Sequence, residues 1–437
     1  MRIEIPRETE RLGPIMFNAV QKVYELDSGL IYKKNESKPE EQSVIKRLSY
    51  ESLQGIQEEM AIIVPVRNEK IKLIEGVLAG IPHHCQVIIV SNSSREPVDR
   101  FKIERDAIEH VAKFMKKKLI IVHQKDPALG KALEMAGYNY ILDENGIVKN
   151  GKCEGMILST ILAYLCGKKH IGFIDSDNYF PGAVAEYVQE YCAGLYLSHS
   201  PYSMVRIVWH SKPKIVESSL FFAKRGRASE HTNKFLNSLV SYYTGFGTEI
   251  IKSGNAGEHA MTMELAKNLD FSSGYSIEPY HFINMFERFA GIHENPLADV
   301  LKHGIEIYQI ESRNPHLHEV KGDEHVKDMS KAALEVIYRS PLCPEPLRQE
   351  IMNDLSFRDI VEDKDKPMKK EVVYYPAIVN CNLKKLKEGL MNEPYADLLK
   401  VDLSKYEMPK EIGLKRDQLK AMIKRPVDDG KVKLGAK

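Results

Sequence analysis

Four short runs of apolar residues punctuate the first 180 positions, and each of them ends in polar side chains. They are MAIIVPVRNEK (60–70), CQVIIVSNSS (85–94), KLIIVHQKD (118–126) and HIGFIDSD (170–177). Continuous apolar runs are typical of strands buried on both faces, as in a parallel sheet. Amphipathic segments lie between them, at 69–80, 98–117 and 154–167. This alternation predicts an α/β fold with a mostly parallel, twisted sheet flanked by helices.

The polar ends of these runs predict where a ligand binds. In open α/β sheets, ligands bind at the carboxyl ends of the strands. Four polar ends converging on one edge are a stronger signal than any single motif. They are Arg67-Asn68-Glu69, Ser91-Asn92-Ser93, Gln124-Lys125-Asp126 and Asp175-Ser176-Asp177.

The fourth run ends in two carboxylates one residue apart, Asp175 and Asp177. In an extended segment they point the same way, and like charges side by side repel unless a positive charge lies between them. A divalent cation meets that need, since Mg²⁺ is commonly held by one or two carboxylates together with phosphate oxygens of the substrate. A plainer interpretation is also open, in which these residues only cap the helix that begins near Pro181.

Bulk properties exclude several classes of function. The chain has 437 residues with 62 Lys+Arg against 61 Asp+Glu, so no basic field favours nucleic acid. No apolar stretch approaches the ~20 residues of a membrane span, and the first residues do not resemble a signal peptide. The six cysteines show no regular spacing and are expected to be reduced thiols, which predicts a cytoplasmic protein.

After residue 200 the pattern becomes mixed. We expect two strands joined by a turn at 202–227, helices at 229–246, 258–269 and 276–291, a strand running into a loop at 305–319, and helices at 327–340 and 346–360. The segment 404–437 is rich in Lys and Arg and is expected to be a solvated tail. The expected divisions are 1–200 as the nucleotide-sugar part, 201–360 as the acceptor and metal part of the same catalytic unit, and 361–437 as a C-terminal extension.

Several longer motifs carry a family resemblance over roughly residues 1–360. They include VPVRNEK (64–70), VIIVSNSSRE (87–96), HQKDPALGKA (123–132), GFIDSDNYFPGAV (172–184), GRASEHTN (226–233), SGNAGEHAMTM (253–263) and NPHLHEVKGDEHVKDM (314–329). The first motif, the Ser-Asn pair of the second and the Asp-x-Asp of the fourth are similar to the GT-A glycosyltransferase pattern. Together the motifs resemble the mannosyl-3-phosphoglycerate synthase family. The resemblance implies a GT-A fold with a helical C-terminal part. It also implies transfer of mannose from GDP-mannose to 3-phosphoglycerate with retention, giving mannosyl-3-phosphoglycerate, the precursor of the compatible solute mannosylglycerate.

The resemblance also implies a divalent metal, Mg²⁺ or alternatively Mn²⁺, Co²⁺ or Zn²⁺, with Asp177 as the direct ligand. Its partner is expected to be His316 or His318. The related glucosyl-3-phosphoglycerate synthases place a metal-binding histidine a similar distance before a Met-Ser pair. Counting back from Met329-Ser330 favours His318.

Roles for further residues follow from the same motifs. Asp175, Asp177 and Glu278 are expected at the catalytic centre, with Glu278 bonding mannose hydroxyls. The family's GKGEGM reads GKCEGM here, so that Cys153 replaces a glycine. The donor nucleotide is expected to contact Pro65, Arg67, Asn68, Glu69, Ser91, Asn92, Gln124, Lys125, Lys131, Lys152 and Glu154.

The acceptor phosphate is expected at the start of the helix that follows GRAS, where free N–H groups suit anions. Arg227 adds a bidentate donor there, although Ser229 could also be a plain N-cap. The acceptor residues are expected to be Gly226, Arg227, Ser229, Asn255, Ala256, Gly257 and His259. No pair of carboxylates spaced for a covalent mechanism is evident from the sequence, so a front-face mechanism is preferred.

Alternatives remain open at this point. A glucosyl-3-phosphoglycerate synthase or another nucleotide-sugar transferase would share most of these motifs. A nucleotidyltransferase would carry a glycine-rich basic loop after its first strand, which VPVRNEKIK (64–72) lacks. An inactive nucleotide-sugar sensor is disfavoured by the intact Asp-x-Asp and His motifs. We expect a homodimer that binds GDP-mannose and 3-phosphoglycerate but neither nucleic acid nor membrane.

Overall fold

A computed structural model describes residues 1–26, 44–210, 212–216, 219–223, 227–293, 297–317, 323–361 and 363–392. Two of the residues named above, Gly226 and His318, and the tail at 404–437 lie outside these ranges. Within the described ranges, no helix has both the length and the apolar character needed to cross a membrane.

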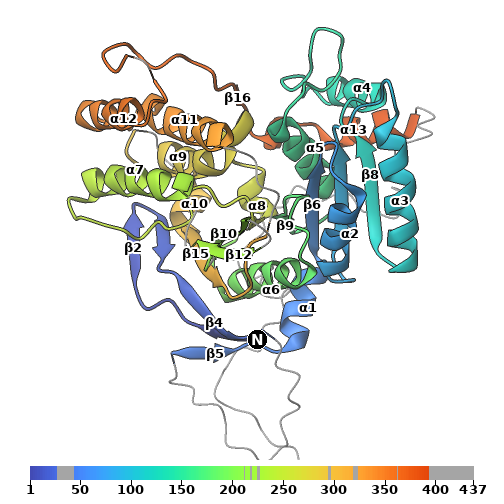
Figure 1. The fold of residues 1–437 in the computed structure, drawn as a ribbon, viewed down its shortest axis with the longest axis horizontal. Helices are drawn as coiled ribbons and strands as arrows, with labels where there is room; N and C mark the ends of the chain where they lie inside the picture. The colour runs from blue at the N-terminus through green and yellow to red at the C-terminus, as the bar shows by residue number, and fades with distance from the viewer. Residues whose placement is uncertain are drawn as a thin grey trace, which may run out of the picture.

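A twelve-stranded sheet runs through the molecule (Figure 1). Strands β2 (Thr9–Leu12) and β3 (Ile15–Asn18) lie off its main path, with β3 paired to β15. The main path is β5 (Ile45–Arg47), β1 (Arg2–Glu4), β4 (Gln21–Glu25), β15 (Ile305–Ser312), β10 (Tyr202–Trp209), β13 (His259–Thr262), β9 (His170–Phe173), β6 (Met60–Val66), β7 (Gln86–Ser91) and β8 (Lys118–His123).

The four strands predicted from the apolar runs are confirmed as β6, β7, β8 and β9, all parallel to one another. Consecutive residues of β6 enter two different cores, since Ile63 packs in one hydrophobic cluster and Ile62 and Val64 in the other. A strand buried on both faces has no polar face to alternate with, which explains the continuous runs. The predicted α/β class with a mostly parallel sheet flanked by helices is therefore confirmed.

Helices cover both faces of this sheet (Figure 1). Their starts follow from local sequence: Asp99 caps α3 by accepting from the N–H of Lys102, and Asp126 caps α4 just before Pro127. One face carries α1 (Tyr50–Glu58), α2 (Ile71–Gly80), α3 (Arg100–Phe114) and α6 (Pro181–Leu197). The other carries α4 (Pro127–Met135), α5 (Lys152–Leu165) and α9 (Ile277–Phe289).

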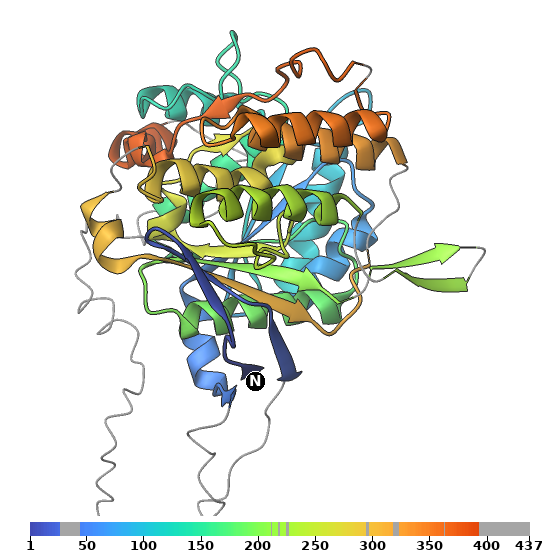
Figure 2. The ribbon, with the colours of Figure 1, turned by 90° about the vertical axis from the view of Figure 1, so that its left-hand side faces the viewer.

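Two expectations for the middle of the chain are wrong. The segment 258–269 begins with strand β13, which lies antiparallel between β9 and β10, and only α8 (Met263–Ala266) is helical. Its residues have good helix propensity, but pairing on both sides decides the structure, because tertiary context overrides propensity. In 202–227, β10 joins the central sheet, and the hairpin is formed by β11 (Lys212–Val216) and β12 (Ser219–Ala223), which projects from the body in Figure 2.

The remaining helical predictions agree with the structure. These helices are α7 (Arg227–Thr244), α9, α11 (Asp323–Arg339) and α12 (Glu345–Phe357). A further short helix, α10 (Ala298–His303), precedes β15. The last described segment contains β16 (Tyr374–Tyr375), the short helix η2 (Ile378–Asn380) and α13 (Leu383–Asn392). Strand β16 pairs with β14 (Phe271–Ser272), and the short helix η1 (Gly274–Ser276) precedes α9. Tyr375, Ile378 and Leu386 belong to the main hydrophobic cluster, so this segment is packed onto the body.

Candidate active site

The Asp-x-Asp segment lies at the carboxyl edge of the sheet, directly after β9. The backbone turns there, since Asn178 N donates to Asp175 O (3.1 Å) and Tyr179 N donates to Asp177 O (3.0 Å). Helix α6 follows with Phe180 as its N-cap and no side-chain capping bond. Neither aspartate therefore caps the helix, which removes the plainer interpretation of these residues. The Asp177 residue is only 8% exposed.

Lys152 joins two carboxylates that come from different parts of the chain. Its Nζ lies 2.8 Å from Oδ1 of Asp175 and 3.0 Å from Oε1 of Glu278. Lys152 is the first residue of α5 and Glu278 lies in the first turn of α9, so two helix starts and one strand end meet here. Burial opposes the charged ammonium, but the two carboxylates outweigh it and hold the pKa of Lys152 well above its usual range.

The loop before β13 covers Asp175. A Cβ at Gly257 would lie 2.9 Å from Oδ2 of Asp175, so a larger residue there would have to displace this carboxylate. The neighbouring Glu258 accepts a hydrogen bond from the amide of Asn178. His259 Nδ1 lies 2.9 Å from the carbonyl oxygen of Gly257, and its pKa is held well below the usual range, first by burial and then by His281. The loop thus packs directly on the Asp-x-Asp turn.

Asn255 lies in the same loop and is 7% exposed. Neither its side-chain nitrogen nor its side-chain oxygen has a hydrogen-bond partner within the described part of the chain. Buried polar groups are nearly always satisfied by protein, water or ligand. Asn255 is therefore a good candidate for contacting a bound molecule.

Arg206 holds this loop from β10, and its role could not be predicted from the sequence. It is fully buried in β10 and donates to the carbonyl oxygens of Ser253 (2.9 Å) and Gly254 (3.1 Å). Its guanidinium carbon lies 4.6 Å from the ring centre of Phe282 in α9. Burial lowers the pKa of Arg206 to about 9, with Glu278 acting in the opposite direction.

Most of the expected donor residues lie at the ends of β6, β7 and β8, but their exposure differs. Asn68 adopts a left-handed φ of 57° while its N–H donates to Ser93 Oγ at 2.7 Å. The hydroxyl of Ser91 donates to the buried Glu104 (3.0 Å), so this side chain is already engaged within the protein. Pro65, Glu69 and Asn92 are half-buried, and Arg67, Lys125 and Lys131 are exposed.

Two of the expected donor residues, Gln124 and Glu154, are buried. The amide nitrogen of Gln124 donates to the carbonyls of Lys149 (2.7 Å) and Gly151 (3.1 Å). Glu154 is 3% exposed and accepts from the hydroxyl of Tyr375 at 2.5 Å. Burial raises the pKa of Glu154, and the Tyr375 bond partly offsets this. Tyr375 was not anticipated, because it comes from the segment expected to be an extension.

Cys153, which replaces a glycine of the family motif, is fully buried in the first turn of α5. A side chain is therefore accommodated at this position. The glycine that the fold requires here is Gly151, because a Cβ on it would lie 1.9 Å from Oε2 of Glu154.

His316 follows β15 and is 6% exposed. Its Nδ1 lies 3.1 Å from the hydroxyl of Tyr187, and its ring centre lies 4.6 Å from that of Trp209. Within the described residues, no three His, Cys, Asp or Glu side chains are close enough together to hold a metal ion. Asp177 and His316, two of the metal ligands expected from the sequence, are both buried.

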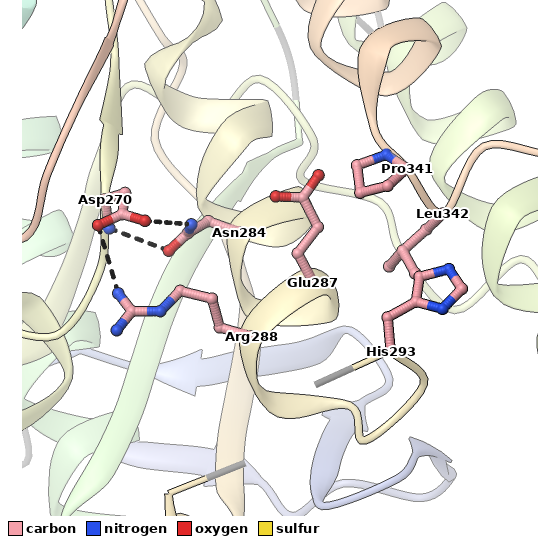
Figure 3. Close-up of a pocket in the computed structure, with 7 residues that line it drawn as sticks. All are labelled: Asp270, Asn284, Glu287, Arg288, His293, Pro341 and Leu342. Carbon is pink, nitrogen blue, oxygen red and sulfur yellow. Dashed lines mark hydrogen bonds and ion pairs between the residues drawn. The ribbon is translucent and has the colours of Figure 1, made fainter. Parts of the chain in front are cut away.

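Two cavities on the described surface are relevant to the placement of ligands. One of about 230 Å³ lies beside the start of α7 and is lined by Val20, Lys22, Val208, Trp209, Ser229, Glu230, Asn233, Lys252 and Glu311. The other, of about 370 Å³, lies at the far end of α9 from Glu278 (Figure 3). There Asp270 pairs with Arg288 and bonds Asn284, so these polar groups largely satisfy one another.

Comparison with known proteins identifies the family. The family model described as mannosyl-3-phosphoglycerate synthase matches residues 5–390. The chain belongs to the mannosyl-3-phosphoglycerate synthase family. The mannosyl-3-phosphoglycerate synthase of Pyrococcus furiosus is 44% identical over 375 residues, covering 85% of this chain and 93% of that protein. That of Aeropyrum pernix is 35% identical over 368 residues, with 84% and 92% covered.

The match places more of the chain in the mannosyl-3-phosphoglycerate synthase family than the motifs did. It continues to residue 390, past the expected limit near residue 360, and so includes Tyr375. A crystal structure of glucosyl-3-phosphoglycerate synthase from Mycobacterium tuberculosis in complex with phosphoglyceric acid is 18% identical. It covers 67% of this chain and 84% of that chain with a TM-score of 0.44, a likeness too distant to bear on this protein.

Proposed function

We propose that this chain transfers mannose from GDP-mannose to 3-phosphoglycerate with retention of configuration, giving mannosyl-3-phosphoglycerate and GDP. Membership of the mannosyl-3-phosphoglycerate synthase family supports the reaction. The structural observation that carries it is the meeting of Asp175, Lys152 and Glu278 at the carboxyl edge of the sheet. This is the edge at which α/β sheets bind ligands.

The donor is proposed to lie across the ends of β6, β7 and β8, with its diphosphate toward Lys152. The ammonium supplies a positive charge beside the Asp-x-Asp turn, where two phosphate groups need compensation. Gln124 and the other polar strand ends line the nucleotide side. Glu278 is proposed to accept hydrogen bonds from mannose hydroxyls, and its contact with Lys152 holds its carboxylate in place.

A divalent ion, Mg²⁺ or another of the metals expected above, is proposed to bind at Asp177 and His316. When bound, it would act as a Lewis acid on the leaving diphosphate. Tyr187 contacts Nδ1 of His316, so the opposite ring nitrogen, Nε2, is proposed as the ligand atom. His318 stays a second candidate outside the described residues.

The acceptor is proposed to bind near the start of α7. 3-Phosphoglycerate carries a phosphate and a carboxylate, and the cavity lined by Ser229 also contains Lys22 and Lys252, beside Glu230 and Glu311. The first N–H groups of a helix suit a phosphate. The unsatisfied side chain of Asn255 provides a further polar contact on the loop that covers Asp175.

A front-face mechanism is proposed for the transfer. A double-displacement mechanism needs a free carboxylate nucleophile beside the sugar. Asp175 and Glu278 instead share the ammonium of Lys152, which reduces their nucleophilic character. The acceptor hydroxyl would then attack from the face that the diphosphate leaves.

The test of this function is a donor panel. The purified chain is incubated with 3-phosphoglycerate and, in separate reactions, GDP-mannose, GDP-glucose, UDP-glucose and ADP-glucose. Mannosyl-3-phosphoglycerate formed from GDP-mannose at the highest kcat/KM supports the proposal. A higher kcat/KM with a glucose donor would identify a glucosyl-3-phosphoglycerate synthase instead.

We also propose that the protein acts as a cytoplasmic homodimer. All six cysteines are free and buried, which suits a reducing compartment. Light scattering coupled to gel filtration tests the dimer, and a mass near 49.8 kDa would show a monomer instead.

A further inference from the structure

Helix α6 contacts the first two residues of the loop that follows β15. The backbone N–H of Arg313 donates to Oε1 of Glu186 at 2.5 Å, and that of Asn314 donates to Oε2 at 2.7 Å. Glu186 is 1% exposed. A buried carboxylate is costly unless its oxygens are hydrogen-bonded, and here each oxygen accepts one peptide N–H from the loop.

Two further contacts extend this attachment along the same helix. One turn before Glu186, the carbonyl oxygen of Gly182 accepts from the amide of Asn314 at 3.5 Å. One residue after Glu186, the hydroxyl of the buried Tyr187 lies 3.1 Å from Nδ1 of His316. Residues 313–316 are therefore held against α6 at three successive points.

The other proposed metal ligand lies just before the same helix. Asp177 lies four residues before Pro181, the first residue of α6, and a hydrogen bond from Tyr179 N to Asp177 O closes the intervening turn. Asp177 and His316 are 139 positions apart in the sequence. Both nevertheless lie next to helix α6.

We infer that α6, through Glu186 and Tyr187, positions the loop at 313–316 so that His316 is preorganised with Asp177 for a divalent cation. Glu186 and Tyr187 are positioning residues and touch neither substrate nor metal in this scheme. The inference rests on the proposed metal site. Groups that orient a ligating histidine typically change metal affinity by roughly 10- to 100-fold when they are removed.

The chain offers a matched control at Glu190, one turn further along α6. It is fully buried, and neither of its carboxyl oxygens has a hydrogen-bond partner in the described part of the chain. Burial, followed by the charge of Glu186, holds the pKa of Glu190 well above its usual range. Because Glu190 interacts with Glu186, the control is Glu190→Gln, which keeps a group that can donate a hydrogen bond to Glu186 and removes no contact to the loop at 313–316.

The experiment measures Mn²⁺ affinity by the electron paramagnetic resonance signal of free Mn²⁺, with GDP present. Glu186→Gln keeps the side-chain shape but offers one acceptor oxygen in place of two. We expect Glu186→Gln to weaken Mn²⁺ binding on the order of 10-fold, Tyr187→Phe to weaken it less, and Glu190→Gln to leave it unchanged. Saturating Mn²⁺ should restore kcat of Glu186→Gln, which a general loss of structure would not allow.

The results separate this inference from the proposed metal site. His316→Ala should weaken Mn²⁺ binding more than any of these variants, and wild-type affinity in His316→Ala would overturn the metal site itself. If His316→Ala loses Mn²⁺ while Glu186→Gln and Tyr187→Phe bind it like the wild type, the positioning role is overturned. If circular dichroism shows that Glu186→Gln does not fold, the Mn²⁺ affinity of Tyr187→Phe alone tests the positioning role. This variant removes only the hydroxyl that contacts His316.

Discussion

The ammonium nitrogen of Lys152 lies 2.8 Å from Oδ1 of Asp175. This contact ties the start of α5 to the segment that directly follows β9. The same ammonium lies 3.0 Å from Glu278 at the start of α9. A single positive charge therefore organises three elements of the candidate site.

Replacing Lys152 by Met should remove that organisation. Asp175 and Glu278 would be left without the cation between them, and the donor diphosphate would lose a charge-assisted contact worth about 1.5–3 kcal/mol. We expect kcat/KM for GDP-mannose to fall by roughly 10- to 150-fold. Steady-state rates measure this, with the exposed Lys113→Met as a control for loss of a lysine. Unchanged kcat/KM in Lys152→Met would remove Lys152 from the donor site.

Tyr375→Phe should show how the C-terminal segment supports the donor side. Glu154 has a raised pKa because it is buried, and Tyr375 stabilises its carboxylate. A raised folded-state pKa means that stability is lost as the pH rises through it. Without Tyr375 this pKa rises further, so the stability difference from wild type should be small near pH 4 and reach about 1–3 kcal/mol near pH 7.

Urea denaturation at both pH values measures the effect of Tyr375→Phe. Tyr374→Phe, on the exposed neighbouring position, is the control. A difference that is largest at the acidic pH would show that Tyr375 does not act through the carboxylate of Glu154.

Arg206→Met should destabilise the loop that covers Asp175. The carbonyl groups of Ser253 and Gly254 would each lose a buried donor at about 1–3 kcal/mol, and relief of the buried charge would offset part of this. We expect the free energy of unfolding to fall by about 2–4 kcal/mol. Denaturant titration measures it. A variant as stable as the wild type would show that water satisfies both carbonyls in place of the guanidinium.

Arg227→Ala should raise the KM for 3-phosphoglycerate and spare the binding of GDP-mannose. Arg227 begins α7, and its charge would add to the helix N–H groups that suit the acceptor phosphate. Loss of a charge-assisted contact costs about 1.5–3 kcal/mol, or roughly 10- to 150-fold in acceptor affinity. Calorimetry with GDP-mannose is the control. The opposite pattern would assign this position to the donor.

Much of this architecture could be predicted from local pattern. The continuous apolar runs of β6 to β9 indicate strands buried on both faces, and the polar residues after them converge on one edge because parallel strands end together. β13 could not be predicted this way, because four residues are too few to show a period and its pairing with β9 and β10 is a long-range property.

The contacts that could not be predicted from the sequence share one physical reason. Arg206 sits within the apolar YSMVRIV (202–208), and no local signal shows that its guanidinium reaches a loop 47 residues away. Tyr375 meets Glu154 across 221 residues. Ser91 stays a predicted donor contact, and the hydrogen bond from its hydroxyl to Glu104 is revealed only by the packing of α3. Each of these depends on tertiary contacts rather than on spacing along the chain.

Asp177, at the carboxyl edge of β9, is proposed to support mannosyl transfer through a divalent cation. The most direct measurement is the rate of GDP release from GDP-mannose with 3-phosphoglycerate, for metal-stripped wild type and Asp177→Asn over a range of Mn²⁺ concentrations. We predict that metal-stripped wild type transfers no mannose and that adding Mn²⁺ restores the rate. In Asp177→Asn the activation barrier should be several kcal/mol higher than in wild type at every Mn²⁺ concentration. Wild-type rates from Asp177→Asn at saturating Mn²⁺ would contradict the account.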